Sequence, residues 1–275
     1  MAARTTPLVR GLLGSARTMV TTLLGRLGRG SFRAIGDAGR LALFVESTAA
    51  GVFRRPLRPI EAIVQLEFVG ARSVGVVALS GIFTGLVLAL QGHNVLVRFG
   101  SENLVGSLVA LSLTRELAPV LTAIMVTARA GSAMAATIGN MAVTEQIDAL
   151  KSLAVEPVKY LAVPRLLASL LSLPLLTAMF SLAGIGAAYL FGISALRLDG
   201  LAFMSNVRSS VEWSDVSIGL VKAALFGGII AGVAAFRGFH TTGGARGVGG
   251  ATSRTVVETA VAILCGDYVV TALYQ

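Results

Sequence analysis

Four charged residues interrupt long apolar stretches of the sequence, and these are the positions where the chain could do chemistry. Arg115 and Glu116 are neighbours in one stretch, whereas Lys222 and Asp267 stand in two others. Ionisable groups at membrane depth are costly and usually mark a substrate path, a proton relay or an ion pair. Adjacent residues point about 100° apart on a helix, so Arg115 and Glu116 cannot both face lipid without cost. Two interpretations stay open for them: coupling to a substrate or conformational change, and a structural ion pair with another span.

Lys222 and Asp267 lie at matching depths, counted from the ends of their apolar stretches. A matched pair would neutralise both charges, so we expect a structural ion pair between them. Glu258 lies one helical turn beyond Arg254, and we expect a plain pair between these two residues.

The composition explains why these few charges stand out. Of the 275 residues, 55% are apolar and only 13% are charged, with a mean hydropathy of +0.80. Soluble domains carry about 25% charged residues, so a soluble enzyme, a disordered protein and a nucleic-acid binder are all disfavoured. One cysteine and two distant histidines argue against a disulfide framework and against a metal site, and we expect no bound metal.

Five stretches are long and apolar enough to cross a bilayer, which takes roughly 20 residues. They cover approximately residues 74–91, 104–128, 166–195, 216–236 and 255–274. The fold class expected is therefore an all-α integral membrane protein with five transmembrane helices.

The basic residues predict the orientation of these spans. Eleven Arg precede the first span, four Lys or Arg lie between the second and third, and three between the fourth and fifth, which makes 18 of 23. Cytoplasmic loops carry such an excess, so we expect a cytoplasmic N-terminus and a periplasmic C-terminus.

Residues 1–60 are expected to form basic amphipathic interfacial and elbow helices, ahead of a domain with the five transmembrane helices over residues 61–275. Apolar residues recur at helical spacing over 11–27, which is typical of a helix lying in the cytoplasmic interface. A partly ordered tail and a transit peptide are the alternatives for this segment. A second amphipathic stretch, residues 39–53, ends at two prolines and three arginines and suggests a bend into the first span.

The segment between the second and third spans contains a short helix, expected over residues 144–150. Thr144 is the predicted N-cap, and Glu145 suits the positive end of the helix dipole. Ile147 and Leu150 form a small apolar pair that is suited either to docking on another protein or to a simple loop helix. Farther on, the Gly-rich stretch 243–250 favours a flexible hinge.

The sequence contains no Gly-Lys-Ser or Gly-Lys-Thr, since none of its three lysines follows a glycine. A phosphate-binding loop needs that element, so this chain is not expected to hydrolyse ATP or to be an enzyme.

Several motifs resemble the MlaE/YrbE-type permeases, the membrane subunits of lipid ABC transporters that work with MCE-domain proteins. The segments that carry the resemblance occur in the same order from about residue 45 onward: 81–85, 89–92, 108–119, 128–133, 144–150, 172–176 and 251–257.

The resemblance implies interfacial helices plus five spans, and a homodimer in the bacterial inner membrane. It implies cytoplasmic ABC ATPase subunits that bind ATP and Mg, with no cofactor on this chain. A periplasmic ring of MCE-domain protein would exchange phospholipid with the dimer and support outer-membrane lipid asymmetry. A coupling helix near residues 143–152 would receive the ATPase motion through Thr144, Glu145, Gln146, Ile147, Asp148 and Leu150.

Motif alignment within that family also implies a lipid-binding set. Its members would line a cavity between the two copies: Leu88, Val95, Leu96, Phe99, Arg115, Glu116 and Leu117. Two other functions stay open from the residues alone, an ion-coupled secondary transporter that uses Arg115 and Glu116, and a scaffold without a transported substrate.

Overall fold

The computed structural model describes residues 36–37, 39–48, 50–51 and 59–274, which fall in two compact units, Met1–Phe44 and Val45–Gln275. In the first unit, residues 39–44 are helical, as the amphipathic pattern predicts. The helix expected over 11–27 and most of the basic, proline-containing bend lie outside the described residues.

The second unit is all-α over its described part. Its α-helices are α2 (Pro59–Val69), α3 (Val74–Leu96), α4 (Val105–Ser112), α5 (Ala118–Val126), α6 (Ser132–Val143), α7 (Gln146–Ser152), α8 (Pro157–Ser194), α9 (Gly200–Ser210), α10 (Trp213–Phe239) and α11 (Gly244–Leu273). Short 3₁₀ turns join α2 to α3 (η1, Ala71–Ser73) and α3 to α4 (η2, Val97–Phe99, and η3, Glu102–Leu104). Two π-helical segments flank α5, namely η4 (Leu113–Leu117) and η5 (Thr127–Gly131).

Among the described residues, five helical runs are long and apolar enough to span a membrane, which agrees with the predicted number. They are Ile60–Phe99, Glu102–Val143, Pro157–Ser194, Trp213–Phe239 and Gly244–Leu273. At about 1.5 Å per residue, the 38 residues of α8 extend to about 57 Å. That length exceeds the roughly 30 Å of a hydrocarbon core, so α8 reaches well beyond it.

Two segments that lie between the predicted spans are helical. The Ala- and Gly-rich residues 132–143 continue the second run as α6, because their small side chains let Ala135, Ile138 and Gly139 bury against neighbouring helices. The stretch 243–250 is the start of α11 and not a flexible hinge. Gly243 and Gly244 take positive φ angles of 87° and 66°, which glycine adopts readily, and they close the short turn over residues 240–243 that follows α10.

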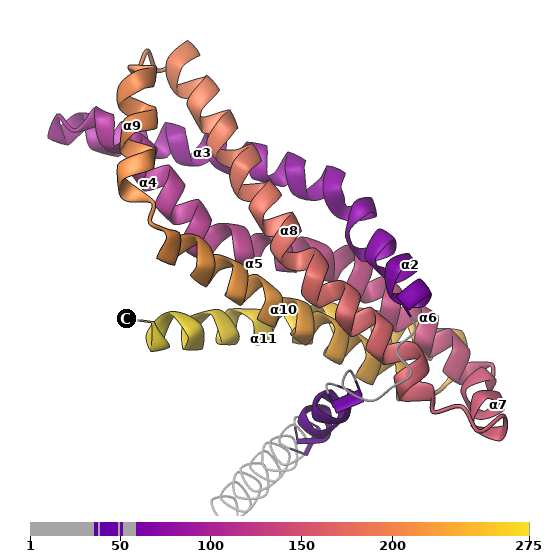
Figure 1. Ribbon diagram of the computed structural model, residues 1–275. Coiled ribbons are helices and arrows are strands. Elements are labelled where there is room, and N and C mark those ends of the chain that lie inside the picture. The colour runs from indigo at the N-terminus through magenta and orange to yellow at the C-terminus, as the bar shows by residue number, and fades with distance from the viewer. Residues whose placement is uncertain (1–35, 38, 49, 52–58, 275) are drawn as a thin grey trace, which may run out of the picture. The chain divides into compact units, whose positions relative to one another are not determined.

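The helices of the second unit form a bundle with two distinct ends (Figure 1). The short helix α7 marks one end, and α9 lies at the other beside the far end of α3. Helix α10 begins, and α11 finishes, part-way along this bundle (Figure 1).

Glycines bring α3 and α8 into backbone contact. A Cβ atom on Gly85 would lie 2.0 Å from the carbonyl oxygen of Gly184, and one on Gly81 would lie 2.7 Å from that of Phe180. Both distances are far below van der Waals contact, so only glycine permits this approach. The first span is thereby held against the longest helix of the fold.

We expect Gly85→Ala to destabilise the protein by about 1–3 kcal/mol, the usual cost of overpacking a tight contact. The free energy of unfolding in mixed detergent micelles measures it. Gly186→Ala is the control, since a Cβ there meets nothing within 4 Å. Equal stabilities for the two variants would contradict the close packing.

Candidate functional site

Arg115 and Glu116 lie on the π-helical segment η4, which interrupts the second span. Such segments are rare and occur frequently at functional sites. Pro119 follows in the first turn of α5. A residue there in a regular helix would donate its N–H to the carbonyl of Arg115, but proline has none. That carbonyl oxygen accepts a hydrogen bond from Lys222 Nζ at 3.2 Å.

Lys222 of α10 is fully buried at the centre of the site. Its ammonium group also donates to Glu116 Oε2 at 2.7 Å and to Thr271 Oγ1 at 2.8 Å. An ammonium has three protons, so these bonds and the one to the Arg115 carbonyl use all of them. Lys222 therefore joins the second, fourth and fifth spans through one nitrogen atom.

Asp267 of α11 completes the site from the fifth span. Its Oδ1 atom lies 3.0 Å from Lys222 Nζ as an ion pair, but it is buried and makes no hydrogen bond. The three protons of Lys222 are directed at Glu116, Thr271 and the Arg115 carbonyl, so none is left to form a hydrogen bond with Asp267. The structure thus brings together Lys222 and Asp267 and adds Glu116 to them, so the two pairs inferred from the sequence form one cluster.

Arg115 extends the cluster toward the start of α10. One of its Nη atoms lies 3.5 Å from Asp215 Oδ1, and Asp215 Oδ2 accepts from the backbone N–H of Glu212 at 3.0 Å. Together these side chains form a charge cluster, which consists of Arg115, Glu116, Asp215, Lys222, Asp267 and Thr271. It has two cationic and three anionic side chains, and so a net charge of −1 when all are ionised.

The sequence did not single out Asp215 or Thr271. Asp215 falls just outside the predicted fourth span, so its charge looked peripheral. Thr271 lies four residues after Asp267 and thus on the same helix face, which is a signal that could have identified it.

Backbone packing holds α10 close enough for Lys222 to reach η4. A Cβ on Gly219 would lie 2.3 Å from the carbonyl oxygen of Thr114, so α10 touches the π-helical backbone one turn before Lys222. This contact places the buried ammonium beside the backbone of Arg115.

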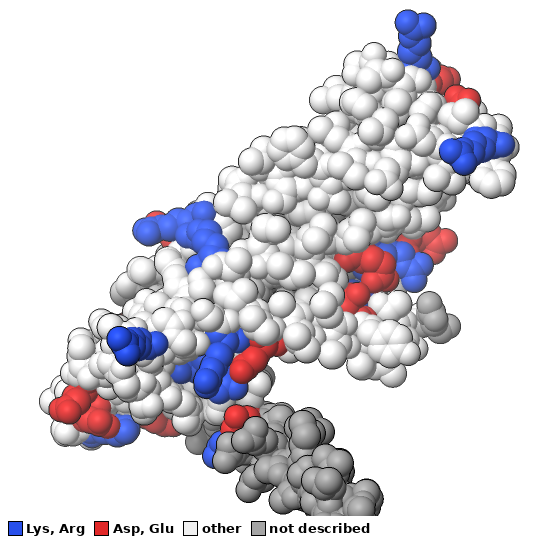
Figure 2. All heavy atoms as spheres, turned by 180° about the vertical axis from the view of Figure 1, so that it is seen from behind, with Lys and Arg blue, Asp and Glu red and all other residues white. Residues whose placement is uncertain are grey.

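The charge cluster is open on one side. The side chains of Arg115 and Glu116 are 39% and 40% exposed, whereas that of Lys222 is fully buried. In Figure 2, a small mixed group of acidic and basic side chains interrupts the white surface part-way along the molecule.

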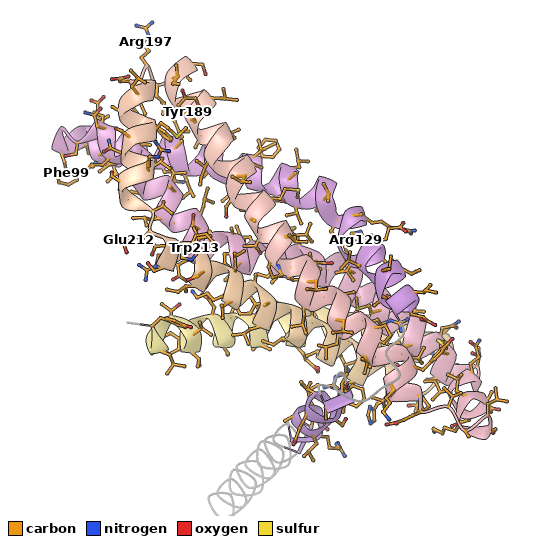
Figure 3. All side chains as sticks on the ribbon, viewed as in Figure 1. Phe99, Arg129, Tyr189, Arg197, Glu212 and Trp213 are labelled. Carbon is orange, nitrogen blue, oxygen red and sulfur yellow. The ribbon has the colours of Figure 1, made fainter. Side chains whose placement is uncertain are left out.

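The other predicted lipid-binding residues lie in different surroundings. Leu88, Leu96 and Leu117 pack against the core, while Val95 and Phe99 are exposed, Phe99 by 75%. Figure 3 shows Phe99 at the tip of the molecule, well apart from Trp213 at the start of α10. A single chain therefore does not enclose the predicted set in one cavity.

The short helix after the second span differs from its prediction at the start. It covers Gln146–Ser152, and its N-cap is Glu145 rather than Thr144. Thr144 instead ends α6 and donates its hydroxyl to the Asn140 carbonyl at 2.8 Å. The chain passes from α6 to α7 through Glu145, whose φ of 59° is unusual for a residue with a side chain.

The apolar face of α7 is also turned inward. Ile147 is only 7% exposed and Leu150 is half-buried, so the pair anchors α7 to its own chain. The exposed residues of this helix include Gln146 and Asp148. Asp148 Oδ1 lies 2.7 Å from Lys151 Nζ on the exposed surface. A partner would therefore meet a polar face of α7.

The expected pair between Arg254 and Glu258 is wrong. Glu258 instead accepts two hydrogen bonds of 2.6 Å from Arg237 of α10. A planar guanidinium matches both carboxylate oxygens at once, which favours this partner over one on the same helix. The contact ties α10 to α11 near their connecting turn.

Arg129, on the second π-helical segment, anchors the first span. It donates to the Phe68 carbonyl at 2.9 Å and to Ser73 Oγ at 2.7 Å, and its guanidinium lies 5.5 Å from the centre of the Phe68 ring. In the sequence, the only sign of this anchoring role is that Arg129 is a single arginine within a Gly- and Ala-rich segment. The junction of α2 and α3 is thereby fixed to the second span.

Comparison with known proteins gives consistent matches over most of the chain. A family model described as "Permease MlaE" matches residues 62–273. A Rickettsia felis protein named "Probable ABC transporter permease protein" is 38% identical over 256 residues, covering 93% of this chain and 99% of the relative.

Two further relatives carry more specific names. A Haemophilus influenzae "Intermembrane phospholipid transport system permease protein MlaE" is 37% identical over 93% of this chain and 98% of its own length. An Arabidopsis thaliana protein, "Protein TRIGALACTOSYLDIACYLGLYCEROL 1, chloroplastic", is 36% identical over 76% of this chain and 60% of its own length.

We expect Lys222→Met to destabilise the protein by about 3–5 kcal/mol, because it breaks a buried ion-pair network and leaves Glu116 and Asp267 without their counter-charge. The triple variant Lys222→Met, Glu116→Gln, Asp267→Asn removes those charges as well and is expected to recover most of the loss. Lys159→Met, at an exposed ion pair with Glu156, is the control and costs about 0–1 kcal/mol. Unfolding in mixed micelles measures all three, and no recovery in the triple variant would contradict the central role of Lys222.

Proposed function

The chain belongs to the MlaE permease family, and from this premise we propose that it is the ABC transporter permease that moves phospholipids between the inner membrane and a periplasmic MCE-domain protein. The name of the Haemophilus relative, a phospholipid transport permease, supports the substrate. In this proposal the activity contributes to the lipid asymmetry of the outer membrane.

The observation that carries the proposal is the half-exposed pair of Arg115 and Glu116 inside a membrane-spanning run. A charged side chain that faces lipid tails is costly, and such groups almost always face a bundle interior or a water-filled cavity. Since one chain leaves these groups open, a second copy that covers them supplies the missing wall. The exposure of Arg115 and Glu116 therefore supports a homodimer with a polar cavity at its interface.

Within that cavity, the two residues have different roles. Glu116 is held by Lys222, whereas Arg115 has one carboxylate contact at 3.5 Å and keeps donors for another group. A guanidinium binds phosphate oxygens in a bidentate way, so Arg115 is the proposed headgroup ligand. Leu88, Val95, Leu96, Phe99 and Leu117 are the proposed acyl-chain contacts around the cavity.

The energy source is proposed to be a separate ABC ATPase that binds ATP and Mg, because the sequence lacks a phosphate-binding loop. The proposed contact is the exposed face of α7, with Glu145, Gln146 and Asp148, while Thr144, Ile147 and Leu150 hold the helix in place. The basic loops expected at the cytoplasmic side support this placement.

A second candidate, an ion-coupled transporter, is favoured by one observation. The charge cluster has one more acid than base, and Asp267 Oδ1 is buried without a hydrogen bond. A proton could occupy such a carboxylate. The two functions differ in energy source, so a transport assay separates them.

We expect Glu116→Gln to lower ATP-driven phospholipid transfer by at least about tenfold, because the cluster loses the carboxylate that accepts a charged hydrogen bond from Lys222. The assay uses the complex with its ATPase in proteoliposomes containing labelled phospholipid. Glu67→Gln, at an exposed pair with Arg72, is the control and is expected to transfer lipid normally. Transfer that needs a proton gradient and continues without ATP would favour the ion-coupled alternative instead.

We expect Asp148→Arg to reduce co-purification of the ATPase several-fold, because it reverses the charge on the exposed face of α7. Glu102→Arg makes the same reversal at the opposite end of the bundle and is expected to leave the yield unchanged. The measurement is the ratio of ATPase to permease after affinity purification. An equal ratio in both variants would argue against α7 as the contact.

A further inference from the structure

A basic pocket lies at the turn between α10 and α11, far from the charge cluster on the same two helices. It is a hollow of about 310 Å³, within the usual range of about 300–1,000 Å³ for small-ligand sites. The lining residues that matter here are Arg237, His240, Thr242, Arg246, Gly250 and Arg254. These six define the basic pocket, and nothing in the proposed transport cycle uses them.

The pocket has an excess of positive charge. Glu258 engages Arg237 through both carboxylate oxygens, which neutralises one of the three guanidinium groups. Arg246 and Arg254 make no ion pair with any residue in the described part of the chain. Two guanidinium groups thus line the hollow without an ion-pair partner among the described residues.

The spacing along α11 makes room between these two groups. Arg246, Gly250 and Arg254 follow each other at intervals of four residues, so they lie on one face of the helix. A Cβ on Gly250 would meet nothing within 4 Å, so open space separates the two arginines where a side chain would otherwise stand. The gap is suited to a compact anion held from both sides.

The wall opposite α11 is firmly built. A Cβ on Gly247 would lie 1.9 Å from the carbonyl oxygen of Thr242, so the turn touches the first turn of α11. Thr241 Oγ1 donates to the Arg237 carbonyl at 2.9 Å, and the rings of Phe236 and His240 are 4.4 Å apart. A preformed wall reduces the entropy lost on binding.

The surface beyond the pocket is apolar. Val257, Val261, Leu264 and Tyr268 are all exposed and follow Arg254 along α11 at intervals of three or four residues. This stripe begins one turn after Arg254, within the membrane-spanning run Gly244–Leu273. A molecule with an anionic head and apolar chains would match the order of pocket and stripe.

We propose that the basic pocket binds a phosphate group, and that the phosphate belongs to an anionic phospholipid whose chains lie along the stripe. Arginine matches phosphate oxygens through parallel N–H donors. The site is separate from the lipid cavity proposed at Arg115, and its occupancy does not depend on transport. A soluble phosphate ester would share the same chemistry, so the test separates the two sources.

The first test compares two adjacent glycines. Gly250→Glu places a carboxylate between Arg246 and Arg254, whereas Gly249→Glu adds the same charge one residue away, outside the lining, and also into open space. The full chain is placed in nanodiscs of phosphatidylglycerol and phosphatidylcholine, and native mass spectrometry measures the phospholipid that stays bound after the protein is released from the nanodisc. We expect retained phosphatidylglycerol to fall at least about tenfold in Gly250→Glu alone, because the new carboxylate competes with the phosphate for the two arginines. A tenfold loss corresponds to about one charged hydrogen bond. An equal effect of both variants, or of neither, would overturn the proposal.

The second test removes the arginines and identifies the source of the phosphate. Arg246→Gln with Arg254→Gln is expected to abolish the preference for phosphatidylglycerol, while Arg197→Gln with Arg208→Gln, the same charge change at the other end, keeps it. Glycerol 1-phosphate is the soluble probe. If the wild type binds glycerol 1-phosphate but retains no phosphatidylglycerol, and the Arg246 and Arg254 variant does not bind the probe, the phosphate site stands but the lipid assignment is overturned. Equal retention of lipid and probe by all three proteins would overturn both.

Discussion

The buried ammonium of Lys222 is the interaction on which the membrane-embedded part of this protein depends. It is enclosed by three spans, and its protons are all directed at fixed acceptors: a carboxylate, a hydroxyl and a backbone carbonyl. A buried charge is stable only with partners of good geometry. The relative positions of the second, fourth and fifth spans therefore follow from the need to surround one nitrogen atom.

Irregular backbone makes that enclosure possible. The π-helical turn presents Glu116, Pro119 lacks the N–H that a regular helix would direct at the Arg115 carbonyl, and Gly219 lets α10 approach. Each feature weakens an ideal helix on its own. Together they create acceptors where a cation needs them, and they leave Arg115 and Glu116 accessible from one side.

The sequence allowed the number of spans, the pairing of Lys222 with Asp267 and the family to be predicted, because apolar length, matched depth and motif order are local signals. It did not reveal that Glu116 shares Lys222, since that contact depends on a π-helical turn that apolar periodicity does not encode. Glu258 pairs across helices with Arg237 rather than along its own helix, which requires knowing the angle between α10 and α11. Thr144 looked like an N-cap, but the N-cap is Glu145, whose left-handed backbone moves the start of the helix by one residue.

The double linkage between α10 and α11 bears on how the chain enters the bilayer. Each helix alone would carry an uncompensated ionic group into hydrocarbon, at about 2.5–3.5 kcal/mol for Lys or Asp near the helix centre. Lys222 meets Asp267 near one end of the hairpin, and Arg237 meets Glu258 near its turn. The two helices are joined by a short turn, residues 240–243, which ends in Gly243 at a positive φ. The last two spans can thus enter the bilayer together as one hairpin whose charges neutralise each other. This hairpin already carries Lys222, the cation that pairs with Glu116 of the second span.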